Sequence, residues 1–142
     1  MSLNQDYIKI GYDKIGSSFQ VRKVAGRNLR EQYYRDALAW ELREKGYTIE
    51  KEVLIPALYK GIEIDDAYRA DIVVDNRVII EVKALRAMGE IECRQILTYL
   101  TLSNFKLGYL INFGAKEFHT GKLEDTLPYS KGIYRIVHNI ED

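Results

Sequence analysis

Cysteine and histidine are scarce in this sequence, which has one Cys and two His among its 142 residues. The lone cysteine, Cys93, excludes a disulfide within the chain, and it has no histidine or lysine at helical spacing to favour a thiolate. His119 and His138 are isolated from each other, so the ligand set of a zinc site is missing. Neither a disulfide scaffold, nor thiolate catalysis, nor zinc chemistry is indicated.

Charge of one sign and long apolar runs are also missing. Lys and Arg together number 21, as do Asp and Glu, so the formal net charge is zero. Because the protein has no overall positive field, any contact with nucleic acid must be made by a local patch. No apolar run approaches the roughly eighteen residues of a membrane span, and no signal sequence is evident. We therefore expect a cytoplasmic protein with no membrane segment.

The residues that are present indicate one compact globular domain. Hydrophobic residues make up 46% of the chain and charged residues 30%, a balance typical of folded soluble proteins. No internal repeat, low-complexity tract or linker divides the chain, so we expect a single domain over residues 1–142. Eleven tyrosines raise the prospect of a contact surface, such as that of a homodimer.

Two helices are predicted in the first third of the chain. Apolar residues recur at helical spacing in both: Ile8, Ile15 and Phe19 in the first, and Tyr34, Leu38 and Leu42 in the second. The first covers residues 7–23, although glycines and serines weaken it. Asn28, followed three residues later by Glu31, predicts a capping-box start for the second helix, which Gly46 ends.

The remaining pattern predicts a sheet that helices cover on both faces. We expect strands over residues 47–59, 67–74, 78–83, 106–113 and 132–137, and a third helix over residues 88–103. Residues 72–74 and 78–80 are apolar on both strand faces, which requires a layer above and a layer below. The predicted fold class is therefore α/β, with the order α-α-β-β-β-α-β-β.

Three ionisable residues stand at the ends of the two inner strands. Glu81 and Lys83 are two apart and must project from the same face of their strand. Asp71 joins them only if the hairpin loop has the right length. A two-residue loop would set Asp71 opposite Ile80, whereas a three-residue loop over residues 75–77, or a bulge, would set it opposite Glu81. We predict the second arrangement.

Two converging carboxylates and a lysine suit metal-assisted phosphodiester chemistry. Mg²⁺ takes oxygen ligands from one or two acids and completes its shell with waters and substrate phosphate. The ammonium group of Lys83 could orient the attacking water and offset the charge that builds on phosphoryl oxygens. The alternative is an ordinary ion pair, because Glu-x-Lys is common at strand ends.

Five motifs occur in order along nearly the whole chain. They are NLREQYY at residues 28–34, YRAD at 68–71, EVKA at 81–84, QILTY at 95–99 and NFG at 112–114. In this set the sequence resembles the GxxExxY family of the PD-(D/E)XK nuclease superfamily. The resemblance implies a restriction-endonuclease-like mixed β-sheet flanked by α-helices, with Asp71 and Glu81 as ligands of Mg²⁺, for which Mn²⁺ could substitute. It also implies that Lys83 is the catalytic lysine.

The resemblance carries further residues outside the two inner strands. Glu31 matches an acid contributed by the helix before the sheet, although it could instead serve only as the capping-box residue. Gln95 and Tyr99 look like the Q-x-x-x-Y element of RecB-type nucleases, or they could be a packed pair on one helix face. Asn28 replaces the leading glycine of the family motif, and we expect the turn to be kept because asparagine tolerates positive φ.

The expected function is that of a Mg²⁺-dependent nuclease-like domain that acts on DNA, the substrate type being implied by the resemblance alone. The alternative is a non-catalytic module that keeps the fold and contacts proteins, for example as a homodimer through tyrosine-rich surface. Zero net charge favours the alternative, while the retained acids and lysine favour the enzyme.

Overall fold

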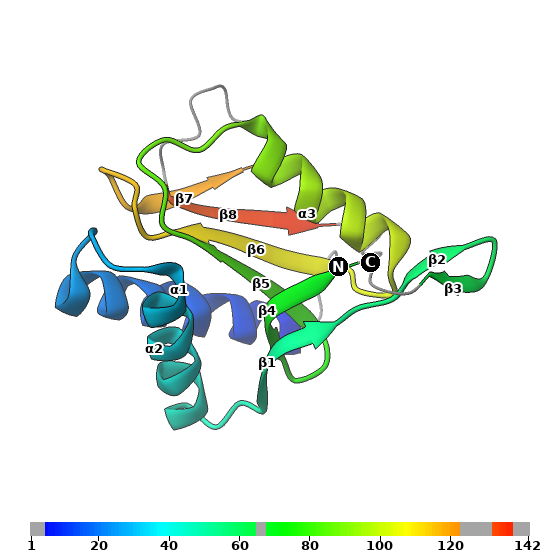
Figure 1. Ribbon diagram of the computed structural model, residues 1–142. Coiled ribbons are helices and arrows are strands. Elements are labelled where there is room, and N and C mark those ends of the chain that lie inside the picture. The colour runs from blue at the N-terminus through cyan, green and yellow to red at the C-terminus, as the bar shows by residue number, and fades with distance from the viewer. Residues whose placement is uncertain (1–4, 65–67, 123–131, 138–142) are drawn as a thin grey trace.

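The computed structural model describes residues 5–64, 68–122 and 132–137 and shows three helices and a mixed sheet (Figure 1). The helices are α1 (Gln5–Ala25), α2 (Glu31–Glu44) and α3 (Glu90–Leu102). The strands are β1 (Ile49–Leu54), β2 (Ala57–Tyr59), β3 (Ile62–Ile64), β4 (Arg69–Val74), β5 (Val78–Lys83), β6 (Leu107–Asn112), β7 (His119–Lys122) and β8 (Gly132–Val137). Within the described ranges, none of the helices has the length and apolar character needed to cross a lipid bilayer.

The main sheet has six strands in the order β1-β4-β5-β6-β8-β7. β5 pairs with β6, and β7 with β8, in parallel, whereas the other neighbours are antiparallel. β2 and β3 form a separate hairpin. The mixed sheet flanked by helices confirms the predicted fold class and is consistent with a restriction-endonuclease-like fold.

The predicted order of elements is right in outline but has too few strands. The single strand expected over residues 47–59 is divided at Pro56 into β1 and β2, because proline has no N–H for a ladder. Lys60 and Gly61 turn the chain with positive φ angles of 51° and 81° into β3, which was not predicted. β7 was not predicted either. Ala67, where the next strand was expected to start, and His138 lie outside the described residues.

Helices cover both faces of the sheet, as the apolar strands predicted. Figure 1 shows α1 and α2 on one face and α3 on the other. Ile72 and Ile80 pack in the cluster that contains Leu38 of α2. Val73 and Ile79 pack in the cluster that contains residues of α3. β4 and β5 are therefore central to the core, and their ends are held from two sides.

The buried face of α1 differs from the predicted one. Phe19, expected on the apolar face, is 41% exposed, whereas Lys14 and Ser17 are buried. The small residues let this helix approach the sheet closely: a Cβ added to Gly11 would lie 2.5 Å from the hydroxyl of Tyr109 on β6. Close backbone approach, rather than apolar periodicity, therefore decides which side of α1 faces the core.

α2 begins later than the capping-box motif predicted. Its first residue is Glu31, and its N-cap is Arg30, which makes no capping hydrogen bond through its side chain. The positive φ of the preceding turn, 74°, is at Gly26, and Asn28 has no positive φ. The buried Tyr34 instead holds the turn before α2, since its hydroxyl donates to Gly26 O at 2.7 Å and accepts Leu29 N at 3.2 Å.

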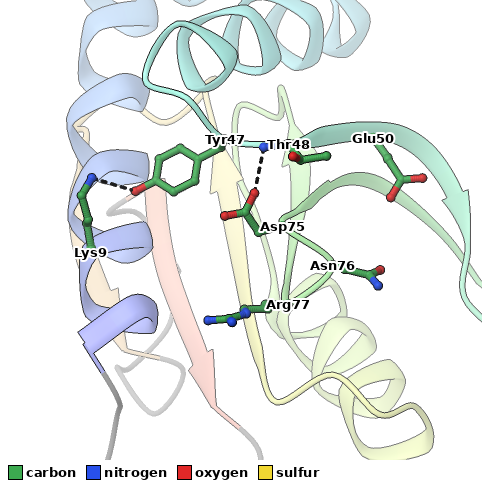
Figure 2. Close-up of a pocket in the computed structure, with 7 residues that line it drawn as sticks. All are labelled: Lys9, Tyr47, Thr48, Glu50, Asp75, Asn76 and Arg77. Atoms are coloured by element: carbon green, nitrogen blue, oxygen red, sulfur yellow. Dashed lines mark hydrogen bonds between the residues drawn. The ribbon is translucent and has the colours of Figure 1, made fainter.

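The turn between β4 and β5 sets the register of the two inner strands. Asp75 and Asn76 take positive φ angles of 50° and 58°, and Arg77 N donates to Val74 O at 2.9 Å. Asp75 also accepts the N–H of Thr48 at 2.8 Å, as Figure 2 shows. A surface cavity of about 620 Å³ adjoins this turn. Because the turn is at the opposite end of the hairpin from Asp71, this larger cavity is separate from the predicted site.

Candidate functional site

β4 and β5 separate where the two acids stand. Their ladder ends at the pair of Ile72 and Ile80, in the register that a three-residue loop imposes. Beyond it, Asp71 N donates to Glu81 Oε1 at 3.1 Å, and Val82 N donates to Asp71 Oδ2 at 2.8 Å. Past the end of the ladder, the two carboxylates thus accept backbone N–H groups in place of carbonyl oxygens. The predicted juxtaposition of the acids is confirmed.

Burial raises the pKa of both carboxyl groups. For Asp71 it is the largest cause, and the N–H of Val82 and the positive charges of Lys83 and Arg35 oppose it. For Glu81, burial followed by the charge of Asp71 raises the pKa to about 7. Two neighbouring acids that resist being ionised together are typical of a site that a cation completes.

Lys83 shares the face of β5 that carries Glu81. Both side chains are half-buried, while Val82 between them is fully buried. The charge of Lys83 lowers the pKa of both acids. Among the ion pairs of the described residues, however, none involves Lys83. In the part of the chain that the structure describes, Glu81 and Lys83 therefore do not form the ordinary Glu-x-Lys ion pair.

Asn112 fixes the end of β5 and therefore the backbone that carries Lys83. Its side chain, 1% exposed, accepts Leu85 N at 2.8 Å and donates to Leu85 O at 3.1 Å. Phe113 N also donates to Lys83 O at 2.8 Å. A Cβ at Gly114 would come within 2.4 Å of Leu85 O, so only glycine fits there. These contacts give residues 112–114 a positioning role that the motif alone did not reveal.

A cavity of about 280 Å³ lies beside this end of β5. Its polar and aromatic lining comes from Tyr68, Arg69, Glu81, Lys83, Glu92, Gln95 and Tyr99. Four of the six predicted site residues therefore meet in one cavity. Asp71 is not among the lining residues, but its backbone N–H donates to the Glu81 carboxylate. Glu92 was not predicted, and its Oε2 accepts Gly89 N at 3.2 Å at the start of α3.

Gln95 and Tyr99 reach the cavity from α3 in different ways. Gln95 is exposed at the cavity, whereas Tyr99 is half-buried. The Tyr99 ring stacks on Tyr68, with ring centroids 3.9 Å apart and planes 14° apart. Tyr68 in turn lies beside Glu81, and burial followed by the charge of Glu81 raises the pKa of its hydroxyl. Tyr68 was missed because nothing in the sequence relates α3 to the residue before β4.

The structure does not place Glu31 in this cavity. Its side chain is exposed at the first position of α2, so the prediction that it faces the core is wrong. Arg35, one turn later, lies nearer the acids: it pairs with Glu52 at 3.1 Å, and its charge lowers the pKa of Asp71. A catalytic role for Glu31 stays a prediction.

The two acids fit Mg²⁺ or Mn²⁺ better than zinc. Asp71 and Glu81 each keep one oxygen that no described backbone N–H occupies. Over residues 5–64, 68–122 and 132–137, no three His, Cys, Asp or Glu side chains gather closely enough to bind a metal. Cys93 is buried, and burial raises its pKa to about 12, so it offers no thiolate. Two carboxylates suffice for Mg²⁺, which keeps several waters.

A scan against protein-family models agrees with this geometry. The model described as the PD-(D/E)XK nuclease superfamily matches residues 9–123, a stretch that contains all six predicted site residues. Comparison with curated proteins and with solved structures gave no match.

Proposed function

The chain belongs to the PD-(D/E)XK nuclease superfamily, and from this premise we propose that it is a Mg²⁺-dependent nuclease that hydrolyses phosphodiester bonds in DNA. Within the superfamily we propose the GxxExxY family, on the five ordered motifs between residues 28 and 114. We further propose that the enzyme acts in the cytoplasm.

One observation carries this proposal: the carboxylates of Asp71 and Glu81 adjoin at the fork of β4 and β5, and Lys83, which forms no ion pair with a described residue, lines the same cavity as Glu81. Buried acids of like charge are costly unless a cation joins them. We propose that Asp71 and Glu81 hold the metal ion, which would supply Lewis-acid activation of a phosphoryl oxygen or of water.

The roles of the other groups follow from where they lie. Lys83, on the same face as Glu81, is placed to orient the attacking water and to offset the charge that develops on the phosphoryl group. Arg69 and Gln95 line the same cavity and carry donors for phosphate oxygens. In the cavity lining, Arg69 and Lys83 are balanced by Glu81 and Glu92, so we expect the bound metal ion to supply the local positive charge that the neutral chain needs for nucleic acid.

A cleavage assay with metal titration tests the proposal. Purified protein is incubated with single-stranded, duplex and branched DNA, and with RNA, in Mg²⁺, Mn²⁺ or EDTA. We expect metal-dependent cleavage of DNA that Glu81→Gln abolishes together with metal binding. Glu44→Gln, the same change on the exposed last turn of α2, should alter neither. If all substrates stay intact and no divalent ion binds, the proposal fails.

Metal binding is expected to strengthen as the pH rises from about 6 to about 8. Burial and the charge of Asp71 raise the pKa of Glu81 from 4.5 to about 7, and the ion needs the ionised carboxylate. The measurement is calorimetric titration with Mg²⁺ at three pH values in this range, at constant ionic strength. An affinity that does not change with pH would show that Glu81 is not the ligand.

The stability of the metal-free protein should follow the opposite trend. The raised pKa of Glu81 means that the folded state holds this proton more tightly than the unfolded state does. Its contribution to stability is therefore complete below pH 4.5 and lost as the pH rises through about 7. Thermal unfolding measured across this pH range, once in EDTA and once in excess Mg²⁺, compares the pH dependence of stability without and with the metal ion.

A second candidate is a homodimer that acts through protein contacts, and one surface favours it. Leu54, Tyr59, Ile62 and Ile64, at and near the hairpin of β2 and β3, are 54%, 61%, 63% and 46% exposed. Apolar side chains gathered on a surface mark interaction sites. Size-exclusion chromatography with light scattering, combined with the metal titration, separates the candidates, since a dimer indifferent to Mg²⁺ would support the second.

A further inference from the structure

Tyr68 carries a buried polar group whose purpose the proposed chemistry leaves open. The residue is 8% exposed and precedes β4, and its hydroxyl makes no regular hydrogen bond with any described residue. Buried tyrosine hydroxyls nearly always have a partner. Tyr68 and Glu81 line the same cavity, and the hydroxyl interacts electrostatically with the Glu81 carboxylate.

The Tyr68 ring is held firmly enough to act as a support. One face stacks on Tyr99 of α3, with the centroids 3.9 Å apart. Its backbone is fixed as well, because Ile55 N donates to Tyr68 O at 2.8 Å. The hydroxyl is thus carried by a fixed ring into the cavity that Glu81 also lines, so any adjustment that pairs the two groups falls to the longer Glu81 side chain.

Glu81 itself needs such a support. Its Oε1 accepts one backbone bond, from Asp71 N at 3.1 Å, and no other described backbone group holds the carboxylate. We propose that Tyr68 is a positioning residue that donates its hydroxyl to Glu81 and keeps the other carboxylate oxygen directed toward the metal ion. This inference rests on the proposed function in that it concerns the same acid. It also gives Tyr99 a role without metal contact, which is to hold the Tyr68 ring.

The test compares two variants that each remove one tyrosine hydroxyl. Tyr68→Phe keeps the stack with Tyr99 and removes only the proposed donor. Tyr33→Phe makes the same change at a 48% exposed position on α2, outside the cavity. The first readout is Mn²⁺ affinity by calorimetry. The second needs no metal: it is hydrogen exchange of the Asp71 amide, whose acceptor is Glu81 Oε1.

We expect Tyr68→Phe to weaken Mn²⁺ binding about tenfold, the effect typical of losing a group that orients a metal ligand. We also expect its Asp71 amide to exchange several-fold faster, because the Glu81 side chain is freer to leave it. Tyr33→Phe should match the wild type in both. Unchanged affinity and unchanged exchange in Tyr68→Phe would overturn the inference. If the wild type binds no Mn²⁺, the proposed function fails, and the exchange rate alone then decides whether Tyr68 holds Glu81.

Discussion

Replacing Lys83 with alanine is expected to slow DNA cleavage about a thousandfold while leaving metal affinity within about twofold. Lys83 forms no ion pair among the described residues, so its removal leaves no acid newly unpaired. The charge of Lys83 lowers the pKa of Asp71 and Glu81 and so favours their ionised forms. Its removal should therefore weaken metal binding only slightly. The loss should therefore appear in the chemical step and not in the binding of the ion.

Single-turnover cleavage and calorimetry on the same preparation make this measurement. Lys106→Ala, an exposed lysine just before β6 that is absent from the cavity lining, is the matched control and should keep the wild-type rate. Cleavage that survives Lys83→Ala at the wild-type rate would come from a contaminant or from another residue, and either result would remove Lys83 from the site.

The acid pair could be predicted because its geometry depends on short-range rules. Strand alternation alone places Glu81 and Lys83 on one face. The position of Asp71 depends on one further choice, the length of the turn. Asp75 and Asn76 are residue types that tolerate positive φ, and they do adopt it. The same residue types also suit a two-residue loop, so the turn residues alone do not fix the register that the strands adopt.

Residue spacing does not predict the part of the site near α3, because that part depends on contacts between elements far apart in the chain. Gln95 and Tyr99 were expected from the resemblance alone, and Tyr68 and Glu92 were missed. The stack of Tyr68 on Tyr99 exists only once α3 lies on the sheet. Glu31 was predicted on the buried face from the helical pattern, but it is the first residue of α2 and its side chain is exposed. Glu31 keeps its helical spacing to Tyr34 and Leu38, but periodicity does not show how far the packed part of a helix face extends toward the helix end.

In α1, packing against the sheet rather than the spacing of apolar residues decides which side chains are buried. The burial of Lys14 on this helix leads to the second prediction, which concerns stability. Lys14 is fully buried on this helix, and its Nζ makes no hydrogen bond with a described residue. The ammonium group lies 3.7 Å from the centroid of the Tyr109 ring, which offsets part of the loss of water. Burial lowers the pKa of Lys14 well below 10.5, so the folded state disfavours the charged form.

Lys14→Met is therefore expected to raise the free energy of unfolding by about 1 to 3 kcal/mol at pH 7, since methionine fills a similar volume without an unpaired nitrogen. Lys23→Met, an exposed change on the same helix, should have little effect.

The pH dependence of the free energy of unfolding tests whether the burial of Lys14 is a cost. Between the lowered pKa of Lys14 and 10.5, the unfolded state binds more protons than the folded state, so the stability of the wild type rises with pH. The advantage of Lys14→Met over the wild type should then shrink as the pH approaches 10.5. Urea unfolding of both proteins at pH 7 and at about pH 9.5 measures the difference. A destabilised Lys14→Met variant would mean that the amine has a partner that stabilises the fold, and that the burial of Lys14 is not a cost.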